Sequence, residues 1–88
     1  MNSETEQVKV YGADWCGMTT RTLDFLDELG VPYDYVDVEK DPHATEWVKQ
    51  HADGKVKKPT LDIGGTVLVA PDNSELEEVL REHGLLAA

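Results

Sequence analysis

Cysteine is nearly absent from this sequence: Cys16 is the only one in 88 residues. A single cysteine cannot form an internal disulfide, which excludes a small secreted fold held together by disulfide bonds. The sequence also lacks a long apolar run, and residues 1–7 are mostly polar. We therefore expect neither a signal peptide nor a membrane-spanning helix, and we predict a cytoplasmic protein.

Basic residues are scarce as well. Eight Lys and Arg stand against 18 Asp and Glu, for a formal net charge of -10. Binding to nucleic acid needs clustered basic side chains, so the composition argues against a nucleic-acid partner. The exception is a local group, Lys55, Lys57 and Lys58, immediately before Pro59. This group fits either an anion-binding loop or a solvated turn.

Hydrophobic periodicity divides the chain into strands and helices without internal repeats. It predicts strands at residues 8–11, 33–38, 60–63 and 66–69, and helices at 17–29, 42–51 and from 74 to shortly before Gly84. Asp41 and the following proline are typical of a helix start, Gly64-Gly65 of a two-residue hairpin turn, and Ser74 with Glu77 of a capping box. We expect strands joined through a helix to be parallel and the hairpin to be antiparallel. The order β-α-β-α-β-β-α thus predicts a single α/β domain over residues 1–88, with a four-stranded mixed sheet flanked by helices.

Cys16 lies where the first predicted strand gives way to the first predicted helix. The amides and the dipole of a helix N-terminus stabilise a thiolate, and the pKa of cysteines so placed falls from about 8.5 to roughly 3.5–7.5. Asp14, two residues earlier, would oppose this effect. A small buried cysteine is the alternative, but a glycine-flanked turn is a poor place to bury a side chain. The pattern therefore predicts a reactive thiol.

Three segments resemble the glutaredoxin family, in order and with its spacing, over nearly the whole chain. They are residues 10–19, which include Trp15-Cys16-Gly17-Met18-Thr19, residues 30–42, and Lys58-Pro59-Thr60. Trp-Cys-Gly and the loop Ala70-Pro71-Asp72-Asn73 are most similar to short actinobacterial members, the mycoredoxins. The resemblance implies a thioredoxin-like fold and thiol-disulfide oxidoreductase activity. One departure matters: the family's Cys-x-x-Cys is Cys16-x-x-Thr19 here, so the resolving cysteine is missing and a monothiol reaction is expected.

The resemblance also implies the site residues. They are catalytic Cys16, the motif residues Trp15, Gly17, Met18 and Thr19, and the thiol-binding residues Lys55, Lys57, Lys58, Pro59, Asp72 and Asn73. In the family the proline is cis and lies beside the cysteine, and the lysine loop and the Asp-Asn pair receive the two ends of the bound thiol. The expected co-substrate is glutathione or a mycothiol-like thiol, the expected partners are S-thiolated proteins, and a monomer without a membrane or nucleic-acid partner is expected.

Two other functions stay open from the sequence. Met18 and Thr19 resemble the Cys-Gly-Phe-Ser motif of monothiol glutaredoxins that share a [2Fe-2S] cluster, although the lysine upstream of that motif is replaced by the Gly12-Ala13 neighbourhood. A thioredoxin-fold module that binds proteins without redox chemistry is the other alternative. We predict no metal site from the histidines, because His43, His51 and His83 lack the spacing of a zinc site.

Overall fold

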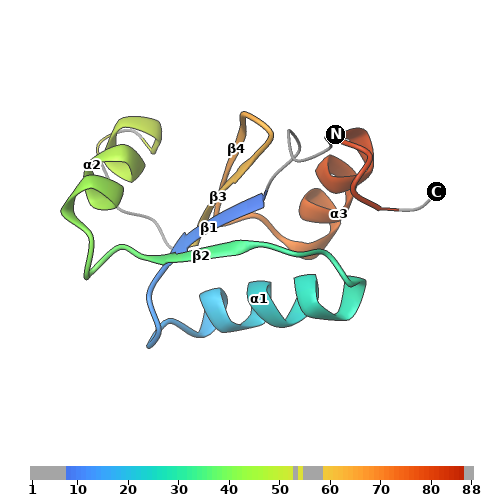
Figure 1. Cartoon of the computed structure of the whole chain (residues 1–88), viewed down its shortest axis with the longest axis horizontal. Helices are drawn as coiled ribbons and strands as arrows, with labels where there is room; N and C mark the ends of the chain where they lie inside the picture. Colours follow the sequence, from blue (N-terminus) through green and yellow to red (C-terminus); the bar gives the residue numbers. More distant parts are fainter. Residues whose placement is uncertain (1–7, 53, 55–58, 87–88) are drawn as a thin grey trace.

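The computed structural model describes residues 8–52, 54 and 59–86. Its elements follow the predicted order. They are β1 (Val8–Gly12), α1 (Gly17–Leu29), β2 (Asp34–Asp37), α2 (Pro42–His51), β3 (Thr60–Ile63), β4 (Thr66–Val69) and α3 (Asn73–Glu82). The strands form one mixed sheet in the order β2-β1-β3-β4, so the predicted four-stranded α/β architecture is confirmed (Figure 1).

β1 lies inside the sheet and sets the register of both neighbours. It runs parallel to β2 and antiparallel to β3, with Tyr11 opposite Val36 on one side and Thr60 on the other. β3 and β4 form an antiparallel hairpin. Its two turn residues, Gly64 and Gly65, have φ values of 55° and 97°, a region that glycine adopts without steric cost and that this hairpin turn requires. The hairpin prediction is therefore confirmed.

The expectation that α2 joins parallel strands is wrong. β3 runs antiparallel to β1, and therefore also to β2. Asp37, which ends β2, lies opposite Gly12, while Thr60, which begins β3, lies opposite the adjacent Tyr11. The connection through α2 thus leaves and re-enters the sheet at the same end of β1. A helix carries the chain into a parallel strand only when it also brings the chain back along the sheet.

The two faces of the sheet are covered by different helices. The larger hydrophobic cluster contains Val8, Val10, Leu26, Val31, Leu61, Ile63, Leu68, Leu76 and Leu80, with Leu23, Leu29 and Val79 packed against it. The smaller cluster contains Val38, Ala44, Val48 and Ala52, with Tyr11, Val36 and Trp47 packed against it. Because α1 and α3 supply the first cluster and α2 the second, α1 and α3 cover one face and α2 covers the other.

α2 is fixed at its start by a cap and along its length by an aromatic stack. The Asp41 side chain accepts hydrogen bonds from the backbone N–H groups of His43 (3.0 Å) and Ala44 (3.2 Å), and the first helical residue is a proline. Trp47 stacks between Tyr11 and His51, with ring centroids 4.5 and 4.2 Å away. The helix start predicted at Asp41 is therefore confirmed.

The N-cap of α3 lies two residues earlier than the sequence predicts. Its N-cap is Asp72, whose carboxylate accepts the backbone N–H of Glu75 at 2.8 Å. The capping box predicted for Ser74 with Glu77 is therefore wrong. Aspartate and serine are about equally good N-cap residues, so either side chain satisfies the local rule. The chain enters α3 from the buried Pro71, and this makes Asp72 the first side chain placed to cap the helix.

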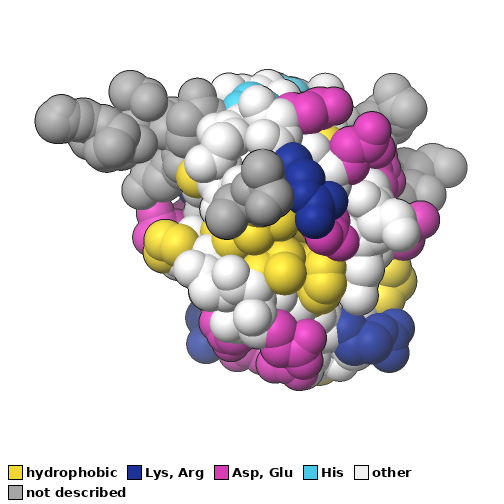
Figure 2. All heavy atoms as spheres, turned by 90° about the vertical axis from the view of Figure 1, so that its right-hand side faces the viewer, with side chains coloured by type: hydrophobic (Ala, Val, Ile, Leu, Met, Phe, Trp, Pro, Cys, Tyr) yellow, Lys and Arg dark blue, Asp and Glu magenta, His cyan; other side chains and the backbone are white. Residues whose placement is uncertain are grey.

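The end of α3 and the residues after it close one end of the core. The Leu85 N–H donates to the Leu80 carbonyl at 2.9 Å, and Leu85 and Leu86 pack against the larger cluster. Figure 2 faces the end of the molecule that lies to the right in Figure 1, and hydrophobic side chains gather at the centre of this face with acidic ones around them. This face is at the opposite end of α1 from the β1–α1 turn (Figure 1).

Ala70 carries local backbone strain between β4 and α3. Its φ is 48°, a left-handed conformation that costs an L-residue with a Cβ about 1–2 kcal/mol. We expect Ala70→Gly to raise the free energy of unfolding by about 0.5–1 kcal/mol, because relief of this strain exceeds the extra entropy of glycine in the unfolded chain. Chemical denaturation measures the change. Ala70→Val is the control and should destabilise the protein, and a glycine variant less stable than the wild type would contradict the assignment.

Candidate functional site

Cys16 is the N-cap residue of α1. Its backbone is extended, with φ −86° and ψ 119°, and its carbonyl accepts the N–H of Thr20 at 3.1 Å in the first turn of the helix. Its own N–H donates to the Ala13 carbonyl at 3.1 Å, which closes the turn after β1. The side chain is partly exposed. The sulfur therefore sits at the end of the helix where unpaired amides and the dipole favour negative charge.

Two side-chain hydrogen bonds tie the turn before Cys16 to β2 and the residues just beyond it. Tyr35 Oη donates to Asp14 Oδ1 at 2.7 Å, and Trp15 Nε1 donates to Glu39 Oε2 at 2.8 Å. The Trp15 side chain is nevertheless 68% exposed. Trp15 is thus a surface residue at the rim of the site, and its ring orientation is fixed at the indole nitrogen.

Thr19 occupies the position at which a second cysteine is missing, and it is 1% exposed. Its hydroxyl accepts the backbone N–H of Ala13 at 3.5 Å. A Cβ added at Gly12 would lie 2.6 Å from Thr19 Oγ1 and 2.7 Å from its Cγ2, so Thr19 lies directly against the end of β1. The side chain therefore packs the helix onto the strand.

Pro59 lies beside the same turn. It is buried, and because Thr60 pairs with Tyr11, Pro59 comes next to Gly12 in the register of β1 and β3. Its carbonyl accepts the N–H of Ala70 at 2.7 Å, which links the start of β3 to the loop before α3. The predicted ligand residues Lys55, Lys57 and Lys58 lie outside the described residues.

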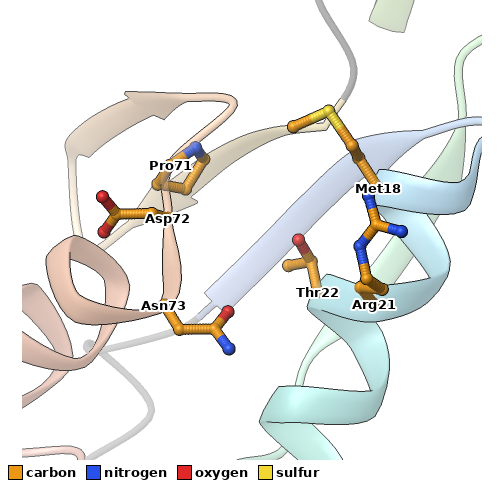
Figure 3. A pocket seen from close by; sticks show the side chains of 6 residues that line it. All are labelled: Met18, Arg21, Thr22, Pro71, Asp72 and Asn73. Atoms are coloured by element: carbon orange, nitrogen blue, oxygen red, sulfur yellow. The ribbon is translucent and has the colours of Figure 1, made fainter.

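A pocket of about 230 Å³ opens between α1 and the segment that leads into α3. It is lined by Met18, Arg21 and Thr22 from α1 and by Pro71, Asp72 and Asn73 (Figure 3). The Asn73 amide points across the gap towards Thr22, whereas the Asp72 carboxylate is turned away from α1 (Figure 3). The structure thus brings the predicted ligand residues Asp72 and Asn73 together with Met18, two residues from Cys16.

The environment of Tyr35 is strongly acidic. Burial is the largest cause that raises the pKa of this phenol above its ordinary value, followed by the hydrogen bond and charge of Asp14 and by the charges of Asp37 and Cys16. All of these favour the neutral phenol. Tyr35 therefore keeps its proton at neutral pH and is a hydrogen-bond donor to Asp14, close enough to Cys16 for the two side chains to interact electrostatically.

The glutaredoxin family model matches residues 8–68, which is more than half of the chain. The chain belongs to the glutaredoxin family. Among curated proteins, it is 43% identical over 54 residues to Mycoredoxin 1 of Corynebacterium glutamicum. That alignment covers 61% of this glutaredoxin and 66% of the mycoredoxin, so the chain spans slightly less than two thirds of its relative.

Solved glutaredoxins have the same fold. The glutaredoxin of Methanosarcina mazei superposes with a TM-score of 0.75 at 29% identity, over 86% of this chain and 79% of its own. The glutaredoxin of Archaeoglobus fulgidus superposes with a TM-score of 0.71 at 22% identity, over 92% and 96% of the two chains. The thioredoxin-like fold expected from the resemblance is therefore confirmed.

Sequence reasoning did not find two features of this glutaredoxin's site. The bond between Asp14 and Tyr35 joins residues 21 positions apart, and only the register of β1 with β2 could have indicated it. Arg21 and Thr22 line the pocket, although Arg21 had no assigned role and Thr22 carried no signal. Arg21 and Thr22 come three and four positions after Met18 and therefore lie on its face of the helix, and this spacing is the signal that could have pointed to them.

No helix in residues 8–52, 54 and 59–86 of this glutaredoxin is both long and apolar enough to cross a membrane. Over the same residues, His, Cys, Asp and Glu side chains form no group of three or more arranged to hold a metal ion.

We expect Gly12→Ala to lower the free energy of unfolding of this glutaredoxin by about 1–3 kcal/mol, because the new methyl overlaps Thr19. In a Thr19→Ala background, the same substitution should cost at least about 1 kcal/mol less, since the overlapping atoms are gone. Denaturant unfolding of the four proteins gives this coupling. Equal costs in the two backgrounds would show that Thr19 does not pack on Gly12.

Proposed function

We propose that this glutaredoxin reduces mixed disulfides between proteins and a low-molecular-weight thiol, with Cys16 as its catalytic residue and without a resolving cysteine. The observation that carries the proposal is the position of Cys16 as the N-cap of α1. The buried Thr19 supports the monothiol form of the reaction, because its side chain holds α1 against β1 and has no thiol to offer.

In the proposed reaction, the Cys16 thiolate attacks the small-thiol sulfur of the mixed disulfide. The disulfide bond breaks, the protein thiolate leaves and takes up a proton, and Cys16 becomes disulfide-bonded to the small thiol. A second small-thiol molecule, as its thiolate, attacks the small-thiol sulfur of that adduct and breaks its bond to Cys16. This releases the small-thiol disulfide and regenerates the Cys16 thiolate, so the two small thiols supply the two electrons. No step needs a thiol at Thr19.

We propose the pocket between α1 and α3 as the place for the non-reacting end of the small thiol. Asp72 and Asn73 line one side and Arg21 the other. The family resemblance supports a ligand carboxylate at Lys55 and Lys57, and pairing of the backbone of Lys58, the residue before Pro59, with the thiol's peptide. These residues remain proposed contacts.

The apolar side chains around Cys16 are proposed contacts of the thiolated protein. Trp15 and Met18, 68% and 41% exposed, are on either side of Cys16 in the sequence. Exposed aromatic side chains bury a large apolar area when a partner covers them, and the flexible methionine side chain adapts to the shape of the partner.

Two small thiols fit the proposal for different reasons. The similarity to Mycoredoxin 1 supports mycothiol. The charged residues Arg21 and Asp72 support glutathione, whose γ-glutamyl end carries both an amino group and a carboxylate, whereas mycothiol is an uncharged sugar conjugate.

The test is intact-mass measurement after the reduced protein meets oxidised glutathione or oxidised mycothiol. We expect one adduct on Cys16, removed by the matching reduced thiol, and none on Cys16→Ser. The thiol that reacts faster is the co-substrate. A folded protein that forms no adduct with either thiol would overturn the oxidoreductase proposal and favour the binding module.

Asp72 combines a structural and a proposed ligand role, which two substitutions separate. Asp72→Asn retains an N-cap side chain, whereas Asp72→Ala loses the cap and about 0.5–2 kcal/mol of stability. If Asp72 receives the glutathione amino group, Asp72→Asn should raise the KM for glutathione about two- to fivefold, as expected for an exposed ion pair. The KM for mycothiol should not change. An unchanged KM for glutathione would remove Asp72 from the ligand site.

A further inference from the structure

The pair Tyr35 and Asp14 is a built feature of the site that the reaction above does not use. The phenol donates to the Asp14 carboxylate at 2.7 Å. Tyr35 lies on β2, where its ring packs against the larger hydrophobic cluster, and its backbone is paired with Val10 of β1. The donor is therefore held by the sheet, while the acceptor belongs to the exposed turn that carries Cys16.

The charge of Asp14 matters to Cys16 because the two residues are two positions apart in one tight turn. A carboxylate near a thiolate disfavours the thiolate by like-charge repulsion. A neutral hydroxyl that donates to the carboxylate draws its charge towards the donor and limits where the carboxylate can move. The phenol is also near enough to feel the charge of Cys16. Tyr35 thus contacts Asp14 and also lies within electrostatic reach of Cys16.

We propose that Tyr35 is a positioning residue that holds the Asp14 carboxylate on β2 and thereby preserves the reactivity of the Cys16 thiolate. The inference rests on the proposed function, in which that thiolate is the nucleophile. It assigns Tyr35 no contact with the substrate. The hydrogen bond acts on Cys16 through Asp14.

The other charged groups near this turn have contacts other than Tyr35. Glu39 accepts from Trp15 and is also held by its own N–H, which donates to Asp37 Oδ1 at 2.9 Å. Asp37 is also 4.0 Å from Lys40 Nζ. Arg21 reaches back along α1, with Nη1 3.8 Å from the position of a Cβ at Gly17. Among these groups of the described chain, Asp14 is the carboxylate nearest to Cys16 in sequence and the one bonded to Tyr35.

The test is the pH dependence of Cys16 alkylation by iodoacetamide, an uncharged reagent that reports the thiolate without any disulfide substrate. Removing the phenol hydroxyl in Tyr35→Phe should raise the pKa of Cys16 by about half a pH unit. Asp14→Asn should lower it by a similar amount, because the like charge is removed. The phenylalanine retains the ring, and circular dichroism with thermal unfolding checks that each variant folds.

The double variant decides whether Tyr35 acts through Asp14. In the Asp14→Asn background, Tyr35→Phe should shift the pKa of Cys16 by less than half of its effect in the wild type. An equal shift in both backgrounds would overturn the proposal, since the phenol would then act on the thiol by itself. A folded Tyr35→Phe with an unchanged pKa would also overturn it.

Failure of the proposed function has a different signature. It would appear as an absence of disulfide adducts on wild-type Cys16, whereas alkylation would still report how Tyr35 and Asp14 affect the thiol.

Discussion

The packing of Thr19 against Gly12 determines where the Cys16 sulfur lies. The end of β1 has no side chain at Gly12, and Thr19 fills that space while it accepts the Ala13 N–H. The first turn of α1 is thereby pressed onto the strand, and Cys16 becomes the residue at which the helix begins. A threonine suits this position because its β-branched side chain has few rotamers to lose when it is buried. Loss of a second cysteine therefore leaves the support of the first one intact.

The electrostatics of the turn contain two opposed effects. A helix N-terminus favours a negative charge by about 0.3–1 kcal/mol at an exposed site. Two unit charges 4 Å apart at an effective dielectric constant of 20 repel by about 4 kcal/mol, and this falls with distance. In the proposed role of Tyr35, the position of the Asp14 carboxylate sets how strongly this repulsion opposes the helix N-terminus at Cys16. A strand residue can hold that position because the sheet fixes it, whereas the exposed turn cannot do so alone.

The sequence signals that predicted the fold are local ones. Each of these signals acts within a few residues, and the structure contains the feature that each one predicts. They are the helix start at Asp41 and the following proline, the turn at the glycine pair 64 and 65, and the buried strand face of Leu61 and Ile63. Local sequence could not decide whether Asp72 or Ser74 caps α3, because the two residue types are about equally good caps. The path of the chain after Pro71 decides between them. The predicted direction of β3 was wrong for the same reason, because that direction depends on where the chain re-enters the sheet.

The features of the site likewise separate into those set by local sequence and those set by the folded chain. The place of Cys16 follows from a strand, a turn and a helix in succession, so the sequence predicted it. The Asp14–Tyr35 bond and the pocket depend on elements that meet only in the folded chain.

The chemistry of that pocket bears on the choice of thiol. Capping of α3 uses Oδ1 of Asp72, and a carboxylate has a second oxygen that can accept from a ligand amine. Arg21 lies on the other wall of the pocket, and its positive charge suits a ligand carboxylate, which an uncharged sugar conjugate does not have. Under the proposed function, sequence similarity therefore supports mycothiol, whereas the charged residues that line the pocket support glutathione.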